Sequence, residues 1–595
     1  MKIRLISIFV FVLILTSCKE APQVEVTEVK LPSLQEVLSN YHEASLKLNP
    51  LNATYSGDTR YNDQLPIDIS ENHKTKVWVF NMRYRDTLEM YPDQNLTEEQ
   101  LMSKAVLNWE IEQALNRHKF SSELIPINQM FSLPLTIGQL GSGSGAQPFN
   151  NHPDYMNWLA RLERFASWCD TAVVNMKKGV DAGYVLPKSL IKKVIPQLED
   201  LTKGKTEENL FYIPVQNMPD ILTEREKKQI IESYTTTLEL KIIPAIERLN
   251  EYIKTEYKEA GRTSSGIDMI PEGKEYYKYL IRYYTTTNMT ADEIHELGLK
   301  EVERIASEME KIKNEVGFEG SLKEFFNHVR SKKELMPFKE PQEVIDNFYA
   351  IHERMKSNLE NMFDLTPKTD FEVRRTEEFR EASASAEYNP GSLDGTRAGI
   401  FYVPIPDVKS YNLFSDEDLF LHEAIPGHHY QISLQQENTQ LPEFRKTIWY
   451  SAYGEGWALY AESLGKQLGL YTDPYQYFGM LSAEMHRAIR LVVDTGLHSK
   501  GWTREQAIQY SLDNEAEGEA SIISEIERYM AIPGQALSYK IGQLKILELR
   551  ELAKKDLGSK FDIKTFHNKV LESGCIPLQL LETKIKKWIS KQKSE

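Results

Sequence analysis

Apolar residues recur at spacings of three and four along most of the chain, which is the period of an amphipathic α-helix. The clearest segment begins at Thr290-Ala291-Asp292-Glu293, a capping box. Its apolar positions are Ile294, Leu297, Val302, Ile305, Met309, Ile312 and Val316. Such a stripe forms the buried face of a helix, so this segment is predicted to be a core helix. From residue 31 onward most of the sequence has this character, and we expect a mainly α fold.

Strand character is concentrated in one place. Gly399-Ile400-Phe401-Tyr402-Val403 is a short β-branched and aromatic run, bounded by Gly399 and by Pro404. The pattern predicts a strand, and hence a short β-sheet, just before the histidine cluster described below.

The first residues have the pattern of a bacterial lipoprotein signal. A basic start, Met1 to Arg4, precedes an apolar run from Leu5 to Leu15 that is too short to remain as a membrane-spanning helix. Leu15-Thr16-Ser17-Cys18 resembles a lipobox. This resemblance implies removal of residues 1–17 and lipidation of Cys18; the alternative is an ordinary cleaved signal with a chance cysteine. Because Lys19 rather than Asp follows Cys18, nothing argues for inner-membrane retention. We expect an extracytoplasmic, lipid-anchored protein at the outer membrane, if the cell has one, or at the cell surface or periplasmic side.

Composition and charge limit the domain organisation and the partners that the rest of the chain can have. Residues 18–30 are a polar tether, and residues 31–595 are expected to form a single helical domain with two lobes at about 31–380 and 381–595. The net charge of −16 becomes −18 without Lys2 and Arg4, which argues against nucleic acid as a partner. Hydrophobic residues make up 41% of the chain, enough for a large core. Cys169 and Cys575 alone define no disulfide framework.

Candidate chemistry lies in two neighbouring motifs. His422-Glu423-Ala424-Ile425-Pro426-Gly427-His428-His429 is followed by Gly454-Glu455-Gly456-Trp457-Ala458-Leu459-Tyr460-Ala461-Glu462, in a chain with only 13 histidines. Zinc hydrolases commonly hold the ion with two His and one Glu and leave one position for water. A carboxylate beside that water then serves as the base, as the Glu of H-E-x-x-H does. The cluster therefore predicts a Zn²⁺ site.

The histidine spacing differs from H-E-x-x-H. On an unbroken helix His428 lies about 120° away from the His422 face, while His429 returns to that face about 10 Å along the axis. Neither can share one ion with His422 unless the helix is deformed. Pro426 clashes with the carbonyl of His422, and Gly427 allows the backbone to bend. We expect a kink or bulge that brings His428 or His429 back to the metal.

The motifs resemble a known family. H-E-x-x-P-G-H-H followed by E-G-W-A-x-Y-x-E is similar to the bacterial family called domain of unknown function eight-eight-five, which consists largely of lipoproteins and secreted proteins. Its further matches are Gln147-Pro148-Phe149 with Asp154-Tyr155, Asp394-Gly395-Thr396-Arg397 with Phe401-Tyr402-Val403, Arg490 to His498, and Arg528-Tyr529 through Pro533-Gly534-Gln535-Ala536. There is also a more distant likeness to gluzincin peptidases of the angiotensin-converting-enzyme and thimet-oligopeptidase type.

The resemblance implies a large two-lobed, zincin-like helical fold with a deep central cleft. Matching Gly-His to Gly-His makes His422 and His428 the imidazole ligands, with Glu455 as the third ligand and Glu423 as the base. His429 and Glu462 stay open as alternative ligands, and Glu462 has two further interpretations: an acid that orients a ligand, or a helix carboxylate paired with a nearby base.

Further candidates come from the same resemblance and, for Tyr539 near the Pro533-Gly534 turn and Arg397 just upstream of the strand, from position in the sequence. Arg528-Tyr529 resembles an Arg-Tyr pair whose phenol stabilises the oxyanion, and Tyr539 is a rival donor. The strand at Gly399 corresponds to an edge strand that pairs with extended substrate. Arg397 either meets a substrate carboxylate or forms a surface ion pair.

The segment from Glu484 to His498 also carries polar candidates. Asp494 either pairs with Arg490 one turn away or orients a zinc histidine. His498 is a further candidate near the site or the substrate.

These patterns favour a zinc peptidase that cleaves short peptides outside the cytoplasm. Two alternatives remain: a non-catalytic surface lipoprotein that binds peptide or glycan, and a zinc hydrolase of non-peptide amides or esters. Glu423 favours an enzyme, because a binding protein has no chemical need for a base beside a metal ligand.

Overall fold

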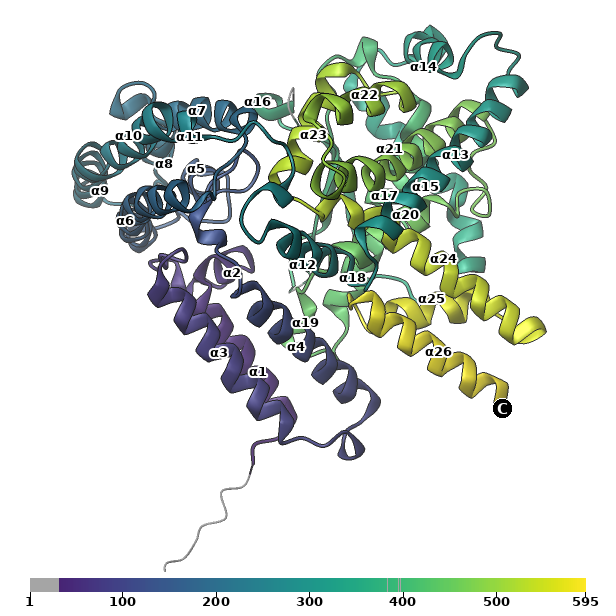
Figure 1. Ribbon diagram of the computed structural model, residues 1–595, viewed down its shortest axis with the longest axis horizontal. Coiled ribbons are helices and arrows are strands. Elements are labelled where there is room, and N and C mark those ends of the chain that lie inside the picture. The colour runs from purple at the N-terminus through teal and green to yellow at the C-terminus, as the bar shows by residue number, and fades with distance from the viewer. Residues whose placement is uncertain (1–30, 382–383, 394, 396, 595) are drawn as a thin grey trace, which may run out of the picture.

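The protein is described by a computed structural model that covers residues 31–594 except residues 382, 383, 394 and 396 (Figure 1). It is mainly helical with one small sheet, which confirms the predicted fold class. The signal peptide and Cys18 lie outside the described residues. Within the described part of the chain, no helix has the length and apolar character needed to span a bilayer.

The N-terminal half supplies two groups of helices. The first group, at the lower left of Figure 1, contains α1 (Leu34–Leu48), α3 (Glu71–Glu89) and α4 (Glu98–Arg117), of which α3 and α4 pack together. The second group contains α6 (His152–Ala182), α7 (Lys188–Thr202) and α10 (Ile243–Tyr252), and α10 packs on both α6 and α7. Figure 1 shows α12 (Gly273–Thr285) between these groups and the C-terminal helices.

The predicted core helix is α13 (Ala291–Glu315). Thr290 caps it by accepting a hydrogen bond from the Glu293 N–H, and the Glu293 side chain completes the capping box. Its buried face includes Ile294, Val302 and Ile305. It packs along α21 (Pro474–Ser499), which also contacts α17 (Asp416–Glu423). The predicted amphipathic helix thus packs against α21, which in turn contacts the helix that carries His422.

The two motifs with the candidate histidines and glutamates lie on short helices of the C-terminal part. α17 packs against α20 (Ser451–Glu462), α21 and α15 (Pro341–Met362), and α18 (His428–Glu437) packs on α20. α20 in turn crosses α24 (Ser538–Leu557) closely. At that crossing a Cβ on Gly456 would lie 2.4 Å from the Cα of Gly542, so two glycines permit the contact.

The sheet has three strands in the order β1-β3-β2. β3 (Gly399–Val403) is the predicted strand, and it pairs in parallel with β1 (Phe371–Arg375) and antiparallel with β2 (Glu387–Asn389). Because both edges of β3 are occupied, the expectation that β3 is an edge strand open to substrate is wrong. Within the described residues, β2 forms the edge of the sheet nearest the histidine cluster's cavity, and Glu387 and Tyr388 line that cavity.

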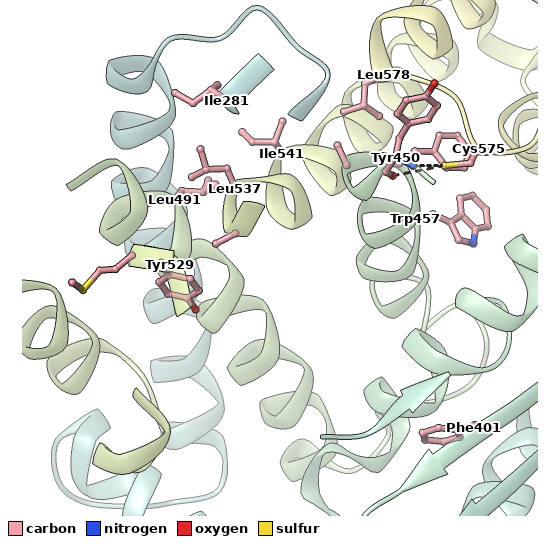
Figure 2. Packing of buried hydrophobic residues seen from close by; sticks show 14 of the residues in the cluster. Ile281, Phe401, Tyr450, Trp457, Leu491, Tyr529, Leu537, Ile541, Cys575 and Leu578 are labelled. Carbon is pink, nitrogen blue, oxygen red and sulfur yellow. Dashed lines mark hydrogen bonds between the residues drawn. The ribbon is translucent and has the colours of Figure 1, made fainter. Parts of the chain in front are cut away.

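Buried side chains form a continuous core around these helices. Figure 2 shows Trp457 of α20, Leu491 of α21 and Ile541 of α24 within it, together with Phe401 of β3. Cys575 is buried and its sulfur accepts a hydrogen bond from the Tyr450 N–H. Tight packing of this kind holds the helices that carry the motifs in a fixed arrangement.

Candidate metal centre and active site

The helix carrying the first motif is interrupted between its histidines. α17 ends at Glu423 and α18 begins at His428, so Ala424 to Gly427 form a sharp connection. The chain passes so close to the last turn of α17 that a Cβ on Gly427 would lie 1.9 Å from the His422 carbonyl oxygen. The Pro426 carbonyl accepts a hydrogen bond of 2.8 Å from the Trp457 indole N–H, which ties the connection to α20. The predicted deformation is therefore a complete break.

This break brings three potential ligands together. Nε2 of His422 lies 3.6 Å from Glu455 Oε2, and Nε2 of His428 lies 3.4 Å from the same oxygen. One ligand atom from each of the three residues falls within 4.8 Å of the others. A tetrahedral zinc ion with bonds of about 2.0–2.1 Å separates its ligand atoms by about 3.3 Å. The spacing and the donor set, two imidazoles and one carboxylate, therefore fit Zn²⁺.

A second carboxylate fixes the orientation of His422. Glu462 is 2% exposed, and its Oε1 lies 2.6 Å from Nδ1 of His422. This hydrogen bond places the proton on Nδ1 and leaves the Nε2 lone pair directed toward Glu455. Glu462 thus occupies the position of an orienting carboxylate, and it does not belong to the group of converging ligand atoms.

The electrostatics of the centre favour a cation. Burial alone would lower the pKa of His422, but the adjacent carboxylates of Glu455 and Glu462 raise that pKa to about 10. Burial would raise the pKa of Glu455, yet the two imidazoles hold it well below its usual range. Positive charge is therefore stabilised between these side chains, where a metal ion would take the place of the proton.

Glu423 lies at the last turn of α17, next to His422. Its side chain is buried and lines the same cavity as the three converging ligands, without being one of them. Burial raises its pKa, and the neighbouring imidazoles of His422 and His428 oppose that rise. A carboxylate beside the centre that is not a ligand has the position required of a base.

His429 faces away from the centre. Its Nδ1 lies 2.9 Å from the Tyr388 hydroxyl, and its ring packs 5.3 Å from that of Phe371 on β1. Burial lowers its pKa to about 4, so the ring is neutral at physiological pH. The alternative that places His429 on the metal relied on an unbroken helix, and the break after Glu423 removes that condition.

Asp494 and His498 are both engaged elsewhere. Asp494 accepts hydrogen bonds from the Tyr277 hydroxyl at 2.6 Å and from the Gly534 N–H, so neither the Arg490 pair nor the metal-site role expected for it is found. His498 accepts from the Ile267 N–H and lies 3.0 Å from the Tyr529 carbonyl. Asp494 lies about 10 Å further along the axis of α21 than Arg487, which lines the cavity together with His486 and Arg490, and at that level it contacts Tyr277 of α12.

The two tyrosine candidates differ in their surroundings. The Tyr529 hydroxyl donates to Glu525 at 2.7 Å and accepts from Arg490 at 3.0 Å, and its side chain is buried. Tyr539 lines the cavity under the Arg490 guanidinium, 4.6 Å from ring centroid to guanidinium carbon. None of the described residues hydrogen-bonds the Tyr539 hydroxyl. Tyr539 therefore has a free donor in the cavity, whereas the donor of Tyr529 is occupied.

The cavity has a volume of about 1730 Å³ and combines distant parts of the chain. Arg397 lines it, as do Tyr41 of α1 and Glu110 of α4. Tyr388 and Trp449 also belong to its wall, and Trp449 lies 5.7 Å from the His428 ring. Sequence reasoning named Arg397 but missed the other four, because they stand outside the motifs and hundreds of residues separate some of them.

Comparison with known proteins fixes the family. A family model for bacterial proteins of unknown function, DUF885, matches residues 50–585. The chain belongs to DUF885. This confirms the family predicted from the motifs, and the match extends well beyond them. A search of curated proteins finds no match.

Two solved structures resemble this DUF885 protein over nearly the whole length of its chain. One is described as the "putative lipoprotein" from Colwellia psychrerythraea, with 27% identity, a TM-score of 0.86, and coverage of 94% of this chain and 99% of that one. The other is described as "a putative lipoprotein of unknown function" from Shewanella oneidensis, with 20% identity, a TM-score of 0.75, and coverage of 93% and 99%. A metallocarboxypeptidase from Trypanosoma cruzi aligns at 12% identity and a TM-score of 0.30, which is too low to support an argument.

Proposed function

We propose that this DUF885 protein is a zinc-dependent peptidase that cleaves short peptides outside the cytoplasm, tethered through a lipidated Cys18. The observation that carries the proposal is the convergence of His422, His428 and Glu455, with Glu423 beside them, in the wall of one large cavity. The lipoprotein descriptions of the two similar structures support the tether.

His422, His428 and Glu455 would hold the ion. The chemistry that zinc would supply there is that of a Lewis acid, which lowers the pKa of water and polarises a carbonyl group. Glu423 takes the proton from the attacking water and delivers it to the leaving amine, which accounts for a carboxylate next to a ligand. Glu462 keeps His422 in the required tautomer. The size of the cavity suits a short peptide better than a folded protein chain.

Metal removal tests the proposal. Incubation with a chelator should abolish cleavage of a peptide library, and added Zn²⁺ should restore it, because the carboxylate base alone cannot activate water sufficiently at neutral pH. Cleavage would be followed by mass spectrometry of the products. Hydrolysis that persists in metal-free protein contradicts the mechanism. A protein that holds zinc but cleaves nothing across the library supports the non-catalytic or non-peptide alternative.

Tyr539 is proposed as the donor to the oxyanion, in place of Tyr529. Tyr539→Phe should lower kcat by about 10²-fold or more with folding preserved, as removal of an oxyanion donor does elsewhere. Tyr529→Phe should instead lower the melting temperature, because Arg490 and Glu525 each lose a hydrogen bond to its buried hydroxyl. Kinetics and thermal unfolding of both variants distinguish which of the two tyrosines is the oxyanion donor. A large kcat loss in Tyr529→Phe alone, at unchanged stability, would return the role to Tyr529.

A further inference from the structure

The cavity contains a group of guanidinium side chains that the proposed hydrolysis does not use. Arg487 and Arg490 lie one turn apart on α21 and both line the cavity. Arg528, on α23 (Glu519–Ala531), lines it as well. Three positively charged guanidinium groups therefore lie in the wall that also holds Glu423. Charged groups that are partly removed from water are normally paired with groups of opposite charge.

Among the described residues, the three arginines have too few carboxylate partners. Arg490 and Arg528 share a single carboxylate: Arg490 Nη2 lies 3.0 Å from Glu525 Oε2, and Arg528 Nε lies 2.9 Å from Glu525 Oε1. Burial would raise the pKa of Glu525, but His486 and the two guanidiniums hold it well below its usual range, so it is ionised. Glu515 pairs with His486, and Glu517, which also lines the cavity, forms no ion pair with these arginines among the described residues. One negative charge therefore serves two arginines.

Arg487 has no ion pair within the part of the chain that the structure describes. It is half-buried, its Nε has no hydrogen-bond partner, and its Nη1 makes only a contact of 3.5 Å with the Ala483 carbonyl. Nη1 of Arg490 also lacks a partner, although Arg490 is only 7% exposed. A guanidinium that has lost much of its water without gaining a counter-ion is costly. The missing anion is therefore expected to come from a ligand.

We infer that Arg487 and Arg490 bind a carboxylate of the substrate, and that this group is the C-terminal carboxylate of the peptide. A guanidinium matches a carboxylate in shape and can bind it with two parallel hydrogen bonds. Arg487, Arg490 and Glu423 line the same cavity, so an anion bound by the two arginines shares that cavity with the base. The C-terminal carboxylate is one residue, about 3.8 Å of chain, from the last peptide bond.

This inference rests on the proposed function and makes it more specific. A peptide anchored by its C-terminal carboxylate beside Glu423 presents the last bonds of its chain for cleavage. The enzyme then acts on the C-terminal end of the peptide rather than at internal sites, and it selects free acids over capped chains.

Matched peptides test the inference on the full metal-loaded chain. One peptide carries a free C-terminal carboxylate, the second has the same sequence with a C-terminal amide, and the third is the amide with Glu as its last residue. We expect kcat/KM for the free acid to exceed that of the amide about tenfold or more, with cleavage near the C-terminus. Arg487→Gln should remove this preference, chiefly through KM, and Arg487→Lys should keep part of it. Arg248→Gln, which removes an exposed arginine on α10, is the matched control.

Binding separates this inference from the proposed function. Calorimetry with the Glu423→Gln protein should show the free acid binding about tenfold or more tightly than the amide, and Arg487→Gln in that background should equalise them. That binding preference supports the carboxylate site even if no chelator-sensitive cleavage is found. Chelator-sensitive cleavage of acid and amide at equal rates, unchanged by Arg487→Gln, overturns the carboxylate site while the peptidase stands. A preference for the Glu-ended amide, or one lost in Arg397→Gln and kept in Arg487→Gln, also overturns the assignment.

Discussion

Replacing Glu423 by Gln should leave the metal and the fold in place and slow peptide hydrolysis by a factor of about 10² or more. The amide has the shape of the carboxylate but cannot accept the proton of the attacking water. Glu423 is not among the converging ligand atoms, so metal content should stay the same. Steady-state kinetics, together with metal analysis of the same preparation, measure both effects.

A matched substitution controls for the loss of one charge. Glu551→Gln changes an exposed carboxylate on α24 that pairs with Lys554, and it should leave turnover unaffected. Equal turnover in the wild type and the Glu423→Gln protein means that the base lies elsewhere, and the mechanism proposed above then fails.

His422→Ala should abolish metal binding, which is expected at close to one zinc ion per chain in the wild type. Removing His422 takes away one of three ligands and leaves Glu462 without its imidazole partner. His428→Ala should likewise reduce affinity severely, whereas His429→Ala should bind zinc normally, because His429 bonds to Tyr388. Metal titration of the three purified proteins checks these expectations.

The histidine series also provides its own control. His429→Ala removes a buried ring just as His428→Ala does, so a general effect of unfolding would appear in both proteins. Loss of affinity in His429→Ala with none in His428→Ala reverses the ligand assignment. Full metal content in His422→Ala rules out this site altogether.

Local sequence patterns were sufficient for the parts of the fold that depend on local physics. The capping box at Thr290 and the apolar stripe after it predict α13 because capping and amphipathicity act within a few turns. The strand at Gly399–Val403 follows from β-branched and aromatic residues between a glycine and a proline. The metal motifs could be recognised because their residues lie within two short stretches of sequence.

The choice between similar residues depended on tertiary structure. His428 and His429 are neighbours, and which of them faces Glu455 is decided by the backbone path through Ala424 and Gly427. Glu462 and Asp494 are both carboxylates on helices near the motif. Only the packing of α17 against α20 brings Glu462 to His422.

The sequence also could not predict whether β3 is a central or an edge strand of the sheet. The run from Gly399 to Val403 indicates a strand but carries no information on its partners. β2 contains only Glu387–Asn389, too short to produce an alternating pattern. The edge of the sheet therefore could not be assigned from the sequence.

The wide separation of the cavity's lining residues has a consequence for the order in which the protein is made. Tyr41 on α1 and Tyr539 on α24 belong to the same wall. A chain that emerges N-terminus first can form its early helices, yet the wall stays incomplete until α24 has emerged. A half-made chain therefore has no finished cavity. If the proposed peptidase function holds, hydrolytic competence arises only when synthesis of the chain is nearly complete.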